Sequence, residues 1–494
     1  MLIRDTRLVR LEPGGSEDAE VLDVRLVDGS VTEVGQGLAA RAEEEFDAQG
    51  RWLMPGLWDA HVHLGQWVRG AARLDLSEVS SVDEATATVV ARAASQPGEA
   101  VVGFGHRPAT WGEQPATAAL DALGLDVPVV LIAGDAHHGW LNSAGLAWLG
   151  LPMTAGVVSE SEWFAAYARL GELLDDEASP RAYARAMARA RAVGIVGMVD
   201  FEFDNAPRTW AARWQAGADL VRVRMATYAD GLDGVLAAGL RSGDPLAGDA
   251  RLTMGPLKVI SDGSLNTRTA WCCEPYAGTG VHGAANQSAA ELEDLLRRAH
   301  GHGLEAAVHA IGDRALTEAL DVFAATGARG TIEHVQLSTR ADLARMAALG
   351  VAASVQPAHL LDDREVSEQW WPGRGDRCFA LRSMTEHGVA LRLGSDAPVA
   401  QLDPWLAMAA AVHRGRTDSE AWHPEQSLTA REALAASTDG WGTVAAGHPA
   451  DLVLLDENPV ADDVSAPSAQ VAARLARCGE LVSSVWVAGV RTDC

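Results

Sequence analysis

The feature that most constrains the fold is a regular alternation of helical stretches with short apolar strands through the middle of the chain. Two of these units read "AYARAMARARAVGIVGMVDFE" and "AAELEDLLRRAHGHGLEAAVHAIGD", each a helix, a glycine stop and an apolar strand. Repeated units of this kind build a parallel sheet, because each helix returns the chain to the same end of the sheet.

The sequence contains eight strands that belong to this alternation of helices and strands. They lie near residues 57–63, 195–200, 220–227, 256–260, 305–309, 331–334, 351–355 and 390–396. Eight parallel strands close into an α/β barrel of the TIM type, (β/α)8, and this is the fold that we predict. A doubly wound open sheet is the alternative.

The two ends of the chain show a different pattern, in which apolar and polar residues alternate as in short antiparallel strands. "VLDVRLVDGSVTEVG" places Asp28-Gly29 at a hairpin turn, and "LVSSVWVAGVRTD" has Gly489 near its turn. Each end alone buries little apolar surface, so we expect both to meet in one small β domain. The predicted domains are 1–53 and 436–494 for this β domain and 54–435 for the barrel, with an insertion at about 70–190.

The composition restricts the classes of function. Acidic residues number 67 against 40 basic ones, and the net charge of −27 opposes binding to nucleic acid or to an anionic membrane. Five cysteines occur without a Cys-X-X-Cys pair, which argues against a disulfide framework and a thiolate zinc cluster. The sequence contains neither a signal peptide nor an apolar run of ~18 residues, so we expect a cytoplasmic protein, and a homodimer is compatible with it.

Polar side chains stand at the ends of several predicted barrel strands. The first strand, in "MPGLWDAHVHLG", ends in two histidines one residue apart, which point the same way on a strand. The residues at these strand ends are His61, His63, Lys258, His309, His334 and Asp396. Active sites of such barrels lie at the carboxyl ends of the strands, so these groups should converge on one rim. Each histidine alone is typical of a core or loop residue, but the cluster indicates a metal site.

The types of ligand suggest the chemistry. Histidines and carboxylates without thiolates suit zinc, and manganese, iron or nickel are alternatives. A bound divalent ion lowers the pKa of its water to about 7, which makes hydroxide available at neutral pH. Asp396 would then act as general base and afterwards as general acid, or serve as one more metal ligand.

Six segments together resemble the amidohydrolase superfamily, and most closely its amidohydrolase family 3 branch, which includes N-substituted formamide deformylase. They are "PGLWDAHVHL", "LKVISDGSLNTRTA", "VHAIGDRA", "IEHVQ", "GSDAPV" and "ADLVLLD". The resemblance covers nearly the whole chain in the expected order. It implies a (β/α)8 barrel, a β-sandwich built from both termini and a site for one or two divalent metal ions.

Specific roles follow from the resemblance. It implies that His61 and His63 bind one metal, that His309 and His334 bind a second metal or a shared site, and that Asp396 is catalytic and touches the metal. In binuclear relatives, a lysine in the position of Lys258 is carbamylated and bridges two metals. The alternative is an unmodified Lys258 that pairs with Asp262 or with the substrate.

Further residues match the pocket of the family more loosely. "DAHHGWLNSAGL" in the insertion, "SDGSLNTRT" after the fourth strand and "VQPAHL" after the seventh supply the candidates. The substrate-binding candidates are His137, Trp140, Asn142, Asp262, Ser264, Arg268, Gln356 and His359.

These observations predict a metal-dependent hydrolase that cleaves an amide, N-formyl or N-acyl C–N bond in a small molecule. In this prediction, a metal-activated hydroxide attacks and Asp396 shuttles the proton. Two alternatives stay open at this stage: a deaminase of the same superfamily, which releases ammonia from a ring carbon, and a barrel without catalysis that serves as a binding module.

Overall fold

The computed structural model describes residues 1–12, 20–76, 79–106, 108, 111–133, 138–173, 179–203, 205–461 and 465–493. The contacts within the chain divide it into two compact units. The first unit joins Met1–Leu64 to Ala184–Cys494, and the second is Gly65–Tyr183. Among the described residues, no helix is long and apolar enough to cross a membrane.

Eight parallel strands form the barrel of the first unit, in the spatial order β19-β18-β17-β16-β15-β13-β12-β6. Their bounds are β6 (Leu57–Val62), β12 (Ile195–Asp200), β13 (Arg222–Thr227), β15 (Asp249–Ile260), β16 (Ala306–Ala310), β17 (Gly330–His334), β18 (Ala352–Val355) and β19 (Leu391–Leu393). A short strand, β14 (Pro245–Leu246), pairs with β15. All eight predicted strands and the predicted fold class are confirmed.

The last strand joins the first only through a narrow seam. The Asp396 backbone nitrogen donates to the His61 carbonyl at 2.7 Å, and the His63 nitrogen donates to the Ala397 carbonyl at 2.9 Å. A side chain at Gly394 would place its Cβ 2.7 Å from the His61 nitrogen, so only glycine fits this seam. The eighth strand therefore ends at Leu393, earlier than predicted, because the chain turns there to meet β6.

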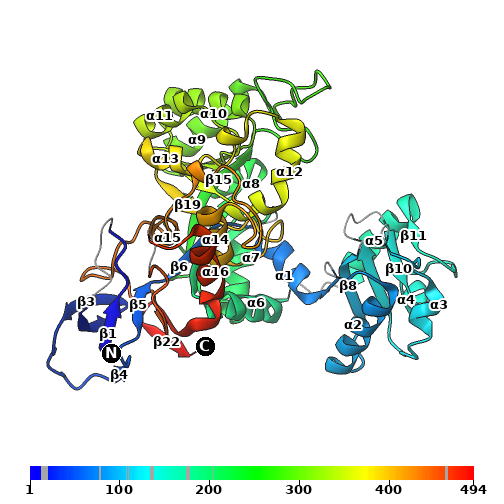
Figure 1. The fold of residues 1–494 in the computed structure, drawn as a ribbon, viewed down its shortest axis with the longest axis horizontal. Coiled ribbons are helices and arrows are strands. Elements are labelled where there is room, and N and C mark those ends of the chain that lie inside the picture. Colours follow the sequence, from blue (N-terminus) through cyan, green and yellow to red (C-terminus); the bar gives the residue numbers. More distant parts are fainter. Residues whose placement is uncertain are drawn as a thin grey trace. The chain divides into compact units, whose positions relative to one another are not determined.

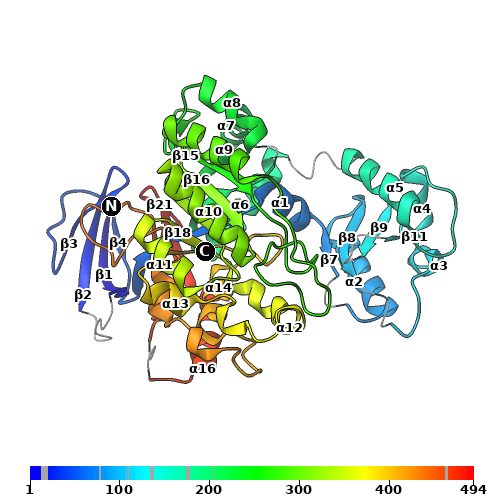
Figure 2. The same ribbon diagram turned by 90° about the horizontal axis from the view of Figure 1, so that it is seen from above.

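Helices surround the strands, and Figure 2 shows α9, α10 and α11 outside β15, β16 and β18. Helix α9 begins at a capping box of Ser288 and Glu291, and α10 buries Leu316, Leu320 and Phe323 on one face. The helices are α6 (Pro180–Ala192), α7 (Pro207–Gln215), α8 (Ala229–Ala237), α9 (Ala289–Gly301), α10 (Asp313–Thr326), α11 (Arg340–Leu349), α12 (Leu360–Trp370), α13 (Leu381–Glu386), α14 (Pro404–His413), α15 (Ala430–Ala435) and α16 (Ser468–Arg477).

Both ends of the chain contribute to one mixed sheet, in which β20 pairs with β5 (Figure 1). Its strands are β1 (Leu2–Leu8), β2 (Val21–Val27), β3 (Ser30–Gly35), β4 (Glu45–Asp47), β5 (Trp52–Pro55), β20 (Leu452–Leu455), β21 (Val482–Val487) and β22 (Val490–Asp493). The predicted turn at Asp28-Gly29 is confirmed, and both residues have the positive φ of a tight hairpin turn. The inward side chains of both ends, including Ile3, Leu53 and Trp486, form one apolar cluster, so neither end is complete alone.

The second unit has its own five-stranded sheet in the order β11-β10-β9-β8-β7. Its elements are β7 (Leu74–Asp75), α2 (Val82–Ser95), β8 (Val101–His106), α3 (Thr117–Asp121), β9 (Val129–Ala133), β10 (His138–Leu141), α4 (Ser143–Trp148), β11 (Val158–Ser159) and α5 (Glu160–Leu173), and α1 (Leu64–Ala72) begins at the junction. The apolar strand predicted in "VPVVLIAG" is β9. The residue limits predicted for the domains stay predictions.

Candidate metal centre

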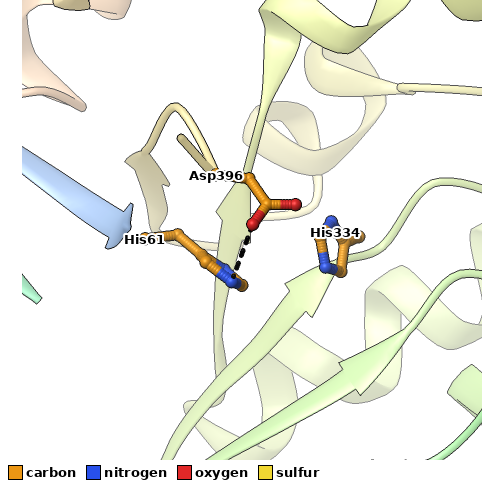
Figure 3. A group of neighbouring side chains, drawn as sticks. All are labelled: His61, His334 and Asp396. Carbon is orange, nitrogen blue, oxygen red and sulfur yellow. Dashed lines mark ion pairs between the residues drawn. The ribbon is translucent and has the colours of Figure 1, made fainter. Parts of the chain in front are cut away.

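Three buried side chains converge at the carboxyl end of the barrel. His61 is the last residue but one of β6, His334 ends β17, and Asp396 follows β19. One ligand atom from each lies within 4.8 Å of the other two, and Figure 3 shows the Asp396 carboxylate between the two imidazole rings. Two nitrogen donors and one oxygen donor at this spacing match the ligands that divalent metal ions use in proteins.

His63 faces the same carboxylate as His61. Its Nε2 and the Nε2 of His61 each lie 3.4 Å from Asp396 Oδ1. The Nδ1 atom of His63 is shielded from solvent and has no hydrogen-bond partner within the described part of the chain. The His-X-His pair therefore projects both rings to one side of the strand, as the alternation of side chains along a strand requires.

A buried carboxylate fixes the orientation of His61. The Nδ1 atom of His61 lies 2.7 Å from Glu333 Oε2, and Thr331 Oγ1 donates to the other Glu333 oxygen. Burial raises the pKa of Glu333, but the hydrogen bond with His61 and the charge of Lys258 outweigh it and leave this pKa below its usual value. An ionised Glu333 holds the ring proton on Nδ1, so the lone pair on Nε2 faces the centre.

Lys258 lies beside His61 in this cluster. Its ammonium nitrogen is 3.3 Å from His61 Nε2 and 4.3 Å from the centroid of the Phe201 ring. Burial lowers the pKa of Lys258 to about 8, although Glu333 and Asp396 act in the opposite direction. The uncharged amine is therefore accessible near neutral pH.

Three of the histidines, His61, His309 and His334, are held neutral. Burial and the nearby Lys258 charge lower the pKa of His61, and the same two causes lower that of His309 to about 3. Burial also lowers the pKa of His334, whose ring centroid lies 4.5 Å from that of His309. Neutral imidazole is the form that binds metal ions.

Asp396 remains ionised. Burial disfavours its charge, but His61, His63 and His334 together hold the pKa of this carboxyl well below its usual value.

The backbone of Asp396 has a φ of 56° and that of His334 a φ of 71°. Both values lie in the left-handed region, which costs an aspartate or histidine about 1–3 kcal/mol and recurs at functional sites. The surrounding seam and strands stabilise these two conformations.

Asp262 connects the loops after the fourth and fifth strands. Its Oδ1 atom lies 3.4 Å from His309 Nε2. The Asp262 carboxylate also accepts hydrogen bonds from the Ile311, Gly312 and Trp271 backbone nitrogens, at 2.8–3.1 Å. This residue therefore holds the position of His309 and does not pair with Lys258.

Asp59 stabilises the seam under the histidine pair. Its Oδ1 atom accepts hydrogen bonds from the His61 and Ser395 backbone nitrogens, both at 3.0 Å. The carboxyl is fully enclosed, and burial raises its pKa from 3.8 to about 6. Because it binds the backbone of His61 and of the residue before Asp396, Asp59 fixes the spacing of these two candidate ligands.

This raised pKa predicts a pH-dependent stability. Between pH 3.8 and about 6 the folded protein keeps a proton on Asp59 that the unfolded chain releases. The free energy of unfolding should therefore fall by about 3 kcal/mol as the pH rises through this window. In Asp59→Asn this contribution should be absent, since the amide oxygen can accept the same two bonds. Urea unfolding midpoints at several pH values measure the difference.

Asp439→Asn is the matched control. Its carboxylate pairs with Arg224 at 2.8 Å, away from the histidines, so this variant should keep the wild-type slope of stability against pH over the window of Asp59. Equal slopes in wild type and Asp59→Asn would contradict the assignment.

The remaining candidates for substrate binding in the first unit lie in different environments. Gln356 Nε2 lies 3.5 Å from His61 Nδ1, and His359 Nε2 lies 3.9 Å from Asp396 Oδ2, so both border the centre. Ser264 bonds within its own loop to Thr267, at 2.9 Å. The exposed Arg268 has its guanidinium 4.7 Å from the centroid of the Trp370 ring. Substrate binding by these four stays a prediction.

The candidates from the insertion belong to the second unit. The Trp140 indole donates to the Ala116 carbonyl at 2.8 Å and is buried in the core of that unit. The Asn142 side chain caps α4 and binds the Val129 nitrogen at 2.9 Å. His137 lies outside the described residues. Their role in substrate binding also stays a prediction.

Glu333 and Asp59 are not among the site residues predicted from the sequence, although both touch His61. Each is an acidic residue inside an apolar strand, in "GTIEHVQL" and "GLWDAHVHL", and this was the available signal. A buried carboxylate is costly without a partner, so such a position indicates a bound neighbour. The sequence could not identify that neighbour, because His61 and Glu333 are 272 positions apart.

Comparisons with known proteins find relatives along most of the chain. Over 487 residues the chain is 27% identical to Protein LONG AFTER FAR-RED 3 of Arabidopsis thaliana, covering 87% of this chain and 83% of that protein. It is 26% identical to the N-substituted formamide deformylase of Arthrobacter pascens, covering 87% and 88% of the two chains.

The solved structures include an uncharacterized metal-dependent hydrolase from Pyrococcus horikoshii. It superimposes with a TM-score of 0.76 and 25% sequence identity, covering 94% of this chain and 98% of that one. Residues 44–493 match the amidohydrolase family. The chain therefore belongs to amidohydrolase family 3, within the amidohydrolase superfamily of metal-dependent hydrolases.

Proposed function

We propose that this protein hydrolyses a C–N bond of the amide, N-formyl or N-acyl type in a small molecule, at a divalent-metal centre. The observation that carries the proposal is the approach of His61, His334 and Asp396 to within 4.8 Å of one another at the carboxyl end of the barrel. The printed name of one relative, N-substituted formamide deformylase, supports the choice of bond.

The residues present fit a metal ion. His61 and His334 are neutral, the Asp396 carboxylate is ionised, and a buried His63 nitrogen lacks a partner among the described residues. His61, His63, His334 and Asp396 would hold the ion, with His309 and Lys258 available to a second one. This set of nitrogen and oxygen donors without thiolates suits zinc.

When bound, such an ion lowers the pKa of a coordinated water and polarises the carbonyl group of the substrate. Asp396 would accept the proton of the attacking water and deliver it to the departing nitrogen. The C–N bond breaks as the C–O bond forms, which yields a carboxylic acid and an amine. Glu333 keeps the His61 tautomer unchanged throughout.

Lys258 would be modified by carbon dioxide. An uncharged amine is required for carbamylation, and a pKa of about 8 supplies it near neutral pH. The resulting carbamate would be an anion that can help to hold divalent metal ions, whereas an ammonium would be repelled by them.

Metal analysis tests the proposal. We expect purified wild-type protein to hold at least one equivalent of zinc or another divalent ion, and His309→Ala to hold less, since His309 lies beside His334. The control is His302→Ala, an exposed histidine at the end of α9. Prolonged chelation should abolish amine release from N-formyl and N-acyl amines, and added zinc should restore it.

Three results would overturn the proposal: protein without metal, hydrolysis that survives chelation, or ammonia released from a heterocycle in place of amine release. The last result would indicate a deaminase.

A further inference from the structure

A pocket of ≈ 820 Å³ adjoins the candidate metal centre. It lies over the carboxyl ends of β12, β13 and β15 and against the first turns of α9, and we call it the α9 pocket. Its volume is within the range of about 300–1,000 Å³ that is typical of small-molecule sites.

Two residues connect the α9 pocket to the centre. Lys258 lines the pocket, and its ammonium nitrogen lies 3.3 Å from His61 Nε2. Phe203 also lines the pocket, and its ring stacks on that of His63 with centroids 5.2 Å apart. A substrate whose reacting bond lies at the histidines can therefore extend directly into this pocket.

The wall of the α9 pocket is mainly apolar and aromatic. The Phe203 ring lies 5.1 Å from that of Tyr228 and is 53% exposed, an unusual state for a phenylalanine beside buried ligands. Val259, Ile260 and Leu295 complete this wall. The Tyr228 hydroxyl already donates to the Phe201 carbonyl at 2.7 Å, so it is not available to a ligand. A ligand would remove apolar surface from water here, which favours binding.

The rim is acidic. Asp230, Glu291 and Asp294 line it, and Lys258 is the one basic residue among the described residues of the pocket. Glu291 caps α9, and Asp294 lies 3.9 Å from Arg298, so their charges are partly compensated. The Gln287 amide nitrogen is shielded and has no partner among the residues described, which makes it a donor for a neutral oxygen.

We propose that the α9 pocket receives an aromatic or bulky apolar group of the substrate that carries no carboxylate, with Phe203 and Tyr228 as the residues that determine specificity. This inference rests on the proposed hydrolysis of a C–N bond and names the substrate class. Carboxylate-bearing N-acyl amino acids are disfavoured, because their charge would approach the acidic rim.

Two substrates that differ only by a carboxylate test the charge preference. They are N-(2-phenylethyl)formamide and N-formylphenylalanine, the second as both enantiomers. We expect kcat/KM, measured as amine release, to favour the uncharged compound by at least about tenfold, which corresponds to about 1.4 kcal/mol. The preference should shrink at high salt, since exposed charges are screened. N-formylphenylalaninamide controls for the added bulk.

A pair of neighbouring alanines tests the location. Ala290 lines the α9 pocket and Ala289 does not, although both are exposed in the first turn of α9. Ala290→Phe should fill the pocket, and the ratio of kcat/KM for N-(2-phenylethyl)formamide to that for N-methylformamide should fall at least about tenfold. Ala289→Phe should leave this ratio unchanged.

Calorimetric binding of N-(2-phenylethyl)formamide to the intact holoprotein separates the two proposals. If the compound binds, Ala290→Phe weakens its binding and no amide is hydrolysed, the pocket is supported and the hydrolysis is rejected. If N-methylformamide is hydrolysed, the hydrolysis is supported. The pocket is then rejected if Ala290→Phe has no effect, if the phenyl compound does not bind, or if the carboxylate compound reacts at an equal rate.

Discussion

Asp396→Asn is expected to lower kcat by between about 10²-fold and 10⁴-fold, the range that a positioned general acid–base supplies. Both histidines of the His-X-His pair approach this carboxylate, each at 3.4 Å. An amide nitrogen or oxygen in its place cannot take a proton from water. Steady-state amine release at saturating substrate measures the effect.

The control for this variant is Asp403→Asn. Asp403 is a half-buried aspartate a few residues along the chain, where its Oδ1 atom accepts hydrogen bonds from the Trp405 and Leu406 backbone nitrogens at the start of α14. Asparagine caps helices as well as aspartate, so this variant should keep wild-type kcat. If Asp396→Asn kept its kcat to within a few-fold, Asp396 would not be the proton shuttle.

His61→Ala is expected to weaken metal binding by more than about 100-fold, because even partners of metal ligands contribute 10- to 100-fold to affinity. The variant should also be less stable without metal. Glu333 and Lys258, which are 1% and 2% exposed, would lose the imidazole that lies between them. A buried charge that loses its partner costs about 3–5 kcal/mol.

Competition with a zinc chelator measures the affinity, and urea unfolding in excess chelator measures the stability. His302→Ala should match wild type in both experiments. If the His61→Ala protein bound metal normally, His61 would not be a metal ligand. If its stability in chelator were normal, Glu333 would have found another partner.

The strands could be predicted from the sequence because their signal is local. The apolar run of each strand and the glycine before it lie within a few residues of each other, and the barrel follows from repeating this unit. The six polar strand ends could be predicted for the same reason. His61, His63, Lys258, His309, His334 and Asp396 each interrupt or end an apolar run, and the structure brings them together as expected.

The sequence predicted less where a residue acts through a distant neighbour. In the sequence, Glu333 and Asp59 are single acidic residues inside apolar strands. Closure of the barrel brings Glu333 against His61 and Asp59 against Ser395. The α9 pocket has the same origin, since Phe203, Tyr228 and Leu295 come from three separate parts of the chain.

The sequence by itself determined the order of strands and helices, the pairing of the two chain ends, the family and the candidate metal-binding side chains. These follow from periodicity and from residue types, which are properties of short segments. Only the tertiary structure decided which atoms meet, which histidine is oriented by Glu333, where Lys258 points and which surface a substrate can reach. Such contacts depend on the closure of the sheet, a property of the whole chain that local patterns do not contain.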